Sequence, residues 1–159
     1  MVLAWASIIG SFYAMTFPLH RPRRLRRSEL IRRMVRETRL TTDGFIYPMF
    51  VCPGQKVRVE VSSMPGIHQQ SADQIVEECR EVESLGIPAI ILFGLPEKKD
   101  ERGTEASDPK GTVQRAIDGI RKAKLNLVVI TDVCLCEYTS HGHCGVVEDG
   151  VVLNDPTLE

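Results

Sequence analysis

Residues 125–131 read LNLVVIT and run directly into residues 132–145, DVCLCEYTSHGHCG. The first of these stretches is largely apolar, and two similar runs precede it at residues 45–51 (FIYPMFV) and 89–93 (AIILF). A continuous apolar run, without strict alternation with polar residues, is typical of a parallel strand that is covered on both faces. The sequence therefore predicts three buried parallel strands.

Two helix patterns separate these strands. The first begins at Ser71, where Gln74 three positions later completes a capping-box pattern, and it ends at Gly86. The second begins at Asp108, which is followed by proline at the first helical position. A further helix is predicted over residues 28–38. The apolar stripes of the first two helices are Ile75, Val76, Cys79, Val82 and Leu85, and Val113, Ala116, Ile117 and Ile120.

The alternation of helices and strands implies a parallel sheet with right-handed crossovers. The sequence pattern predicts a short hairpin at residues 145–153 and the start of another helix at residues 154–157. Three strands alone leave open sheet edges and uncovered apolar faces, so we expect a fold truncated after about three β/α units. An eight-stranded (β/α)8 TIM barrel is the natural completion, with a doubly wound sheet as the alternative. No Gly-x-Gly-x-x-Gly motif follows the first strand, which disfavours a dinucleotide-binding fold.

The N-terminal part of the chain differs in composition from the rest. Residues 1–14 are apolar, but no positive charge precedes them and they are too short to span a bilayer. We therefore expect residues 1–14 to be an extension with no role in folding and no membrane contact. Nine arginines lie between His20 and Leu40. Without aromatic residues among them to stack on bases, and with a net charge of −1, nucleic-acid binding is not expected.

Three of the five cysteines follow the third strand: Cys134, Cys136 and Cys144. Active sites of parallel β/α folds gather at the C-terminal ends of the strands, where this cluster lies. Alternate residues of an extended chain share a side, so the first two thiols can point into one space, and the third returns from the loop. Three thiolates favour Zn²⁺. Clustered reduced cysteines also favour a cytoplasmic location over an oxidising compartment.

The spacing leaves the type of zinc site open. Three protein ligands with a free position are typical of a catalytic site, whereas a fourth ligand from His141 or His143 would close a structural one. A non-enzymatic structural zinc-binding module is therefore the alternative function. Of the remaining cysteines, Cys79 is expected in the core because it lies on a helix stripe, and Cys52 is expected to have no function.

Residues 131–145 resemble the metal-binding segment of the porphobilinogen synthase (5-aminolevulinate dehydratase) family, in its zinc-dependent form. The resemblance runs from about residue 16 to the end of the chain and excludes residues 1–14. It also includes the stretches HRPRRLRR (residues 20–27), YPMFV (47–51), SMPG (63–66), LGIPA (85–89) and VLND (152–155).

The resemblance implies a TIM barrel in which an N-terminal arm, residues 15–27 here, wraps a neighbouring subunit of a homo-oligomer, usually an octamer. Residues 28–159 would form the first part of the barrel domain. The implied enzyme is a hydro-lyase of tetrapyrrole (heme) biosynthesis, which condenses two 5-aminolevulinate molecules into porphobilinogen with loss of two waters.

For this chain the resemblance implies zinc ligands at Cys134, Cys136 and Cys144. Asp132 would orient an amine or relay a proton. His143 matches a position that takes part in a second, non-catalytic metal site in some relatives, and a Mg²⁺ site would lie outside this chain.

The family's two Schiff-base lysines lie in later strands. The six lysines present here stand in polar or loop contexts, where no desolvation lowers a lysine pKa enough to make the amine nucleophilic. We therefore expect the chain alone to be inactive, and to bind zinc weakly or not at all without its remaining half.

Overall fold

The computed structural model describes residues 23–158, so the predicted extension at residues 1–14 and the first part of the arm lie outside the described residues. The chain divides between Leu40 and Thr41 into two compact units. Within the described part, no helix is both long enough and apolar enough to cross a bilayer.

The first unit contains the 3-10 turn η1 (Arg24–Arg26) and the helix α2 (Glu29–Val35). Ser28 caps α2, because its side-chain oxygen accepts a hydrogen bond from a backbone N–H of the first turn. The helix is shorter than the predicted range of residues 28–38, since Arg36 already has an extended backbone.

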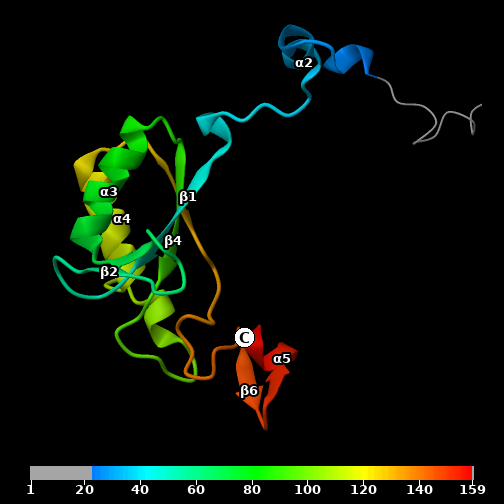
Figure 1. Ribbon diagram of the computed structural model, residues 1–159. Coiled ribbons are helices and arrows are strands. Elements are labelled where there is room, and N and C mark those ends of the chain that lie inside the picture. The colour runs from blue at the N-terminus through cyan, green and yellow to red at the C-terminus, as the bar shows by residue number, and fades with distance from the viewer. Residues whose placement is uncertain (1–22, 159) are drawn as a thin grey trace, which may run out of the picture. The chain divides into compact units, whose positions relative to one another are not determined.

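A five-stranded sheet forms the centre of the second unit, in the order β2-β3-β1-β4-β5 (Figure 1). The three predicted strands are confirmed, and they lie next to one another in parallel register. The bounds of the five strands are β1 Ile46–Val51, β2 Arg58–Glu60, β3 His68–Gln70, β4 Ala89–Gly94 and β5 Val128–Thr131.

The expectation of a wholly parallel sheet is wrong at one edge. Strand β3 pairs in parallel with β1, but β2 pairs with β3 in antiparallel register. The sequence carried a trace of β2, because Val57, Val59 and Val61 alternate with polar residues. The strand is only three residues long, which explains why its pattern was weak.

Two helices, α3 (Ala72–Ser84) and α4 (Thr112–Ala123), lie side by side against one face of the sheet (Figure 1). Their predicted apolar stripes supply the helix side of the core, as expected, except that Leu85 is 59% exposed. Cys79 is fully buried, which confirms its structural role. The buried core residues are Met49, Val51, Ile75, Cys79, Val82, Ile90, Leu92, Val113, Ala116 and Ile120.

The start of the first helix is confirmed, since Ser71 is the N-cap of α3, but its predicted capping bond and the start of the second helix need correction. The hydroxyl of Ser71 makes no capping bond to α3, because it accepts instead from the backbone N–H of Val57 at 2.9 Å and so ties the helix to the β2 edge. Helix α4 begins at Thr112 rather than at Asp108. The four residues before it form a turn, in which the N–H of Gly111 donates to the carbonyl of Asp108 at 2.8 Å.

The C-terminal segment follows the prediction. Strands β6 (Val146–Glu148) and β7 (Val151–Leu153) form an antiparallel hairpin, and α5 (Asn154–Thr157) comes directly after it. Asp149 and Gly150 both have positive φ, at 50° and 78°, as the tight Asp-Gly hairpin turn requires.

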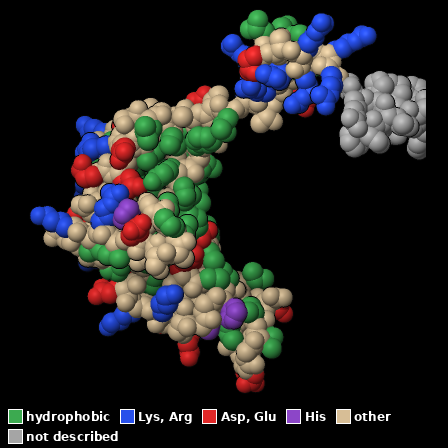
Figure 2. Space-filling model, viewed as in Figure 1, with side chains coloured by type: hydrophobic (Ala, Val, Ile, Leu, Met, Phe, Trp, Pro, Cys, Tyr) green, Lys and Arg blue, Asp and Glu red, His purple; other side chains and the backbone are tan. Residues whose placement is uncertain are grey.

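The sheet face away from α3 and α4 is also apolar. The rings of Phe50 on β1 and Phe93 on β4 lie on it with their centroids 5.5 Å apart. Ile46 and Val128 remain 54% and 60% exposed. Figure 2 shows apolar side chains gathered over this part of the unit. In a complete (β/α)8 barrel such a face lines the filled interior.

Candidate metal centre

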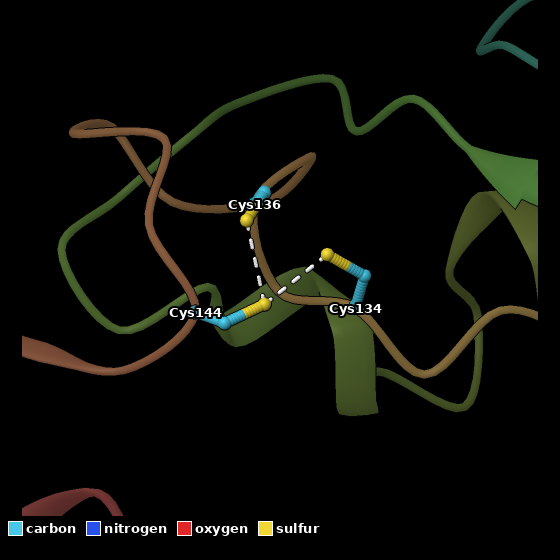
Figure 3. A group of neighbouring side chains, drawn as sticks. All are labelled: Cys134, Cys136 and Cys144. Atoms are coloured by element: carbon cyan, nitrogen blue, oxygen red, sulfur yellow. Dashed lines mark hydrogen bonds between the residues drawn. The ribbon is translucent and has the colours of Figure 1, made fainter. Parts of the chain in front are cut away.

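The three predicted cysteines meet just beyond the end of β5. The sulfur of Cys144 lies 3.1 Å from that of Cys134 and 3.4 Å from that of Cys136 (Figure 3). All three sulfurs lie within 4.8 Å of one another. The loop thus brings together residues that are up to ten positions apart, around Cys144 at the centre.

Backbone contacts within residues 132–145 hold this arrangement. The N–H of Leu135 donates to the Cys144 sulfur at 3.0 Å, and the carbonyl of Leu135 accepts from the N–H groups of Tyr138 and Thr139 at 2.9 Å each. The hydroxyl of Thr139, which is 1% exposed, donates to the carbonyl of His143 at 2.9 Å. The loop therefore closes on itself before it leaves toward the hairpin.

The charged segment at residues 97–108 braces the cysteine loop. The N–H of Asp100 donates to the carbonyl of Tyr138 at 3.3 Å, and the carbonyl of Asp100 accepts from the N–H of Ser140 at 2.9 Å. The Asp100 carboxylate is itself fixed by Thr104, at the start of the 3-10 helix η3 (Thr104–Ser107), and this side-chain hydrogen bond lowers the pKa of Asp100.

The contact between the sulfurs of Cys134 and Cys144 shifts the pKa values of the two thiols in opposite directions. The Cys134 thiol interacts with the Cys144 sulfur, which raises the pKa of Cys134 to about 12 and lowers the pKa of Cys144. The backbone N–H of Leu135 further stabilises the Cys144 thiolate. Of this pair, Cys144 is therefore the first to carry the negative charge that a metal ligand needs.

Two carboxylates lie beside the thiols. An oxygen of Asp132, an oxygen of Glu137 and the sulfur of Cys134 lie within 4.8 Å of one another. Asp132 thus stands where the sequence placed it, at the strand end, with its backbone N–H bonded to the carbonyl of Leu92 at 3.1 Å. Sequence reasoning missed Glu137, although its position directly after Cys136 was the available sign.

Neither histidine of the loop joins the thiols. The rings of His141 and His143 stack on each other with centroids 5.9 Å apart, and His141 Nε2 lies 3.2 Å from the carbonyl oxygen of Glu101. Within the described residues, neither belongs to a group of three metal-binding side chains. The geometry therefore favours the open site over one closed by histidine.

The donor set fits a tetrahedral zinc ion. Zinc–sulfur bonds of about 2.3 Å place tetrahedral sulfurs about 3.8 Å apart. The observed separations of 3.1 and 3.4 Å are shorter than this by about 0.7 and 0.4 Å, so binding requires sulfur movements of less than about 1 Å. A cavity of about 310 Å³ opens beside the cluster, lined by Cys134, Tyr138 and the α4 residue Ile117 among others. The three sulfur donors thus lie next to a cavity that can hold a ligand.

The lysines do not contribute to this site. All six are exposed, and none lies in a strand: Lys56, Lys98, Lys99, Lys110, Lys122 and Lys124. An exposed amine lacks the desolvation that makes a lysine nucleophilic. No lysine of this chain is suited to forming a Schiff base.

The sequence profile of the delta-aminolevulinic acid dehydratase family matches residues 19–159. The chain belongs to this family. The delta-aminolevulinic acid dehydratase of Synechococcus elongatus is 58% identical over 147 residues, which cover 90% of this chain and 45% of that protein. The corresponding protein of Synechocystis sp. is 57% identical with the same coverage. The chain thus spans a little under half the length of these delta-aminolevulinic acid dehydratases.

A solved structure gives the same answer for the fold. Delta-aminolevulinic acid dehydratase (porphobilinogen synthase) from Toxoplasma gondii, in complex with the reaction product porphobilinogen, superposes with a TM-score of 0.80 at 35% identity. The match covers 87% of this chain and 40% of that one. The predicted family is confirmed, and the β/α units described above correspond to part of the larger dehydratase fold.

Proposed function

We propose that this chain supplies the zinc-binding part of a porphobilinogen synthase active site, which condenses two 5-aminolevulinate molecules into porphobilinogen with loss of two waters. One observation carries the proposal: three cysteine sulfurs converge at the C-terminal end of β5, with a cavity beside them. In parallel β/α folds that end of the sheet is where catalytic groups gather. The identity to named dehydratases and the product-bound relative support the same reaction.

The cysteines and Asp132 would have different roles in this reaction. Cys134, Cys136 and Cys144 would hold zinc, which supplies Lewis-acid polarisation of a substrate oxygen when bound. Asp132, which lines the cavity, would orient the amino group of a substrate or take up a proton from it. Such a site requires reduced thiols, which supports a cytoplasmic location.

The chain supplies only part of the chemistry. Its lysines are all exposed, so the Schiff-base step needs residues from other strands. We expect no porphobilinogen from the purified 159-residue chain incubated with zinc and 5-aminolevulinate. Turnover by this chain alone would contradict the proposal that the Schiff-base step needs residues from other strands.

We also propose that the first unit mediates assembly into a homo-oligomer, as the octamer of the family resemblance implies. Leu30 and Met34 lie one helical turn apart on α2 and are 68% and 80% exposed. Figure 2 shows basic side chains around this helix. An apolar stripe left in water on a short helix is best explained by burial against another chain.

Zinc binding is the decisive experiment. Zinc is titrated into the reduced, metal-free chain against a competing chromophoric chelator. The sulfurs are gathered by contacts within one chain, so we expect one zinc per chain, a stronger outcome than the sequence alone suggested. Cys134→Ser and Cys144→Ser should abolish this binding, while Cys52→Ser should leave it unchanged. Equal binding by all three variants, or none by the parent chain, would overturn the proposed site.

A further inference from the structure

Cys144 is the most exposed of the three clustered cysteines. Cys134 and Cys136 are half-buried, whereas Cys144 is exposed, although its sulfur is the one that contacts both of the others. An exposed side chain receives little positional support from packing. The place of the Cys144 sulfur therefore depends on how the backbone next to it is held.

Three hydrogen bonds connect Cys144 to the earlier part of the loop. The N–H of Leu135 donates to the Cys144 sulfur at 3.0 Å. The carbonyl of Leu135 accepts from the N–H of Thr139 at 2.9 Å, and the hydroxyl of Thr139 donates to the carbonyl of His143 at 2.9 Å. Thr139 thus makes two of the three bonds, and its hydroxyl holds the residue directly before Cys144.

The other contacts of the turn at residues 140–143 lie at the surface. The N–H of Gly142 donates to the carbonyl of Thr139 at 3.3 Å, and a Cβ atom at the exposed Gly142 would meet nothing within 4 Å. The exposed ring contact of His141 lies 3.2 Å from the carbonyl of Glu101. Thr139, in contrast, is 1% exposed, so water does not compete for its hydrogen bond.

We propose that Thr139 is the positioning residue for the third thiolate: its hydroxyl holds the carbonyl of His143 so that Cys144 reaches the other two sulfurs. The inference rests on the zinc site proposed above. Hydrogen bonds that orient the ligands of a metal typically contribute about 10- to 100-fold to metal affinity. In this role Thr139 acts through Cys144 and not on the metal itself.

The alternative is that the Thr139 hydroxyl serves the stability of the fold alone, as most buried hydroxyls do. Ser71 offers a matched comparison, because it is 0% exposed and its hydroxyl accepts from the N–H of Val57 at 2.9 Å, at the β2 edge of the sheet. Loss of either hydroxyl removes a buried hydrogen bond and lowers stability. Only the loss at Thr139 should weaken zinc binding.

The test uses the full 159-residue chain with Thr139→Val, which keeps nearly the same shape and removes the hydroxyl. Thr139→Ala removes it without adding a methyl group, Thr139→Ser retains it, and Ser71→Ala is the control. Chelator competition should show zinc affinity reduced about 10- to 100-fold in the first two variants and close to that of the parent chain in the last two. With Co²⁺ in place of zinc, the sulfur-to-cobalt charge-transfer band should weaken in Thr139→Val and not in Ser71→Ala.

Hydrogen exchange of the metal-free chain provides a second readout. The backbone of residues 132–145 should exchange faster in Thr139→Val, because the bond that closes the turn is gone. Thr139→Ser should restore the rate of the parent chain, and Ser71→Ala should leave the exchange of these residues unchanged.

Each outcome decides for or against Thr139. Parent-like zinc binding by Thr139→Val, no rescue by Thr139→Ser, or an equal loss in Ser71→Ala would overturn the inference. If Cys134→Ser and Cys144→Ser bind zinc like the parent chain, the zinc site itself fails, and hydrogen exchange alone decides. Faster exchange in Thr139→Val that Thr139→Ser reverses would then support the positioning of Cys144, and unchanged exchange would overturn it.

Discussion

The backbone of Gly94, at the end of β4, lies directly against the phenol of Tyr138 in the cysteine loop. A Cβ atom at Gly94 would overlap with the Tyr138 hydroxyl oxygen and would lie 2.7 Å from Cγ2 of Val113. The missing side chain therefore makes the space into which the half-buried Tyr138 ring fits. This contact joins the sheet to the loop that carries the thiols.

Replacing Gly94 by alanine should displace Tyr138 and loosen the cysteine loop. Overpacking of this kind costs about 1–3 kcal/mol in the free energy of unfolding, measured by denaturant titration. Zinc affinity should fall together with stability, because Cys136 and Tyr138 belong to the same turn. Gly44→Ala is the control, since a Cβ there meets nothing within 4 Å. Equal stability of the two variants would show that Tyr138 does not anchor the loop.

Thiol labelling should separate the five cysteines by environment. In the reduced, metal-free chain, a chromogenic disulfide reagent should modify the exposed Cys144 first and the half-buried Cys134, Cys136 and Cys52 more slowly. Cys79 should stay unmodified until the chain unfolds, because it is fully buried. Saturating zinc should protect three thiols and leave the rate at Cys52 unchanged. Labelling that zinc does not slow would rule out binding by the cluster.

The sequence was sufficient for the elements that rest on long apolar patterns. The strands at residues 45–51, 89–93 and 125–131 and the buried stripes of the two helices came from hydrophobic periodicity, which the core requires. The cysteine cluster was equally accessible, because residue type and position after a strand are both visible in one dimension. The family resemblance then supplied the reaction.

The remaining features depend on contacts that no local pattern records. The capping box at Ser71 failed because the hydroxyl found a stronger tertiary partner in Val57, fourteen residues earlier. The bracing of the cysteine loop by Asp100 is likewise a long-range backbone pairing. Glu137 was missed because its position beside Asp132 and Cys134 arises only when the loop folds.

The buried thiol of Cys79 should make stability fall at alkaline pH. Burial, and then the charge of Glu78, raise the pKa of Cys79 from 9.0 to about 12. The folded state therefore keeps this proton where the unfolded state loses it. The contribution to stability is complete below about pH 9 and is lost as the pH rises toward about 12. Denaturant unfolding at about pH 8 and about pH 11 should show a larger loss for the parent chain than for Cys79→Ala.

The ionisation of other groups, such as Tyr47, lowers the stability of both chains. Its effect therefore cancels when the loss for Cys79→Ala is subtracted from the loss for the parent chain. Tyr47 also has a pKa raised to about 12, by burial and by its hydrogen bond to Glu78, and it is present in both chains. A loss of equal size in the two chains would mean that Cys79 ionises no differently in the folded and unfolded states.

The apolar stripe of α2 should control the association of chains. Met34→Glu places a charge on a side chain that is 80% exposed in the single chain, so the folding of that chain should be unaffected. If the stripe is buried against another copy, the same charge becomes unfavourable in the assembly, and sedimentation velocity should show smaller species at equal concentration. Leu158→Glu, at an exposed leucine of the second unit, adds the same charge and should leave the sedimentation pattern unchanged. A parent chain that sediments as a monomer at all concentrations, or a Met34→Glu chain that assembles like the parent, would remove α2 from the interface.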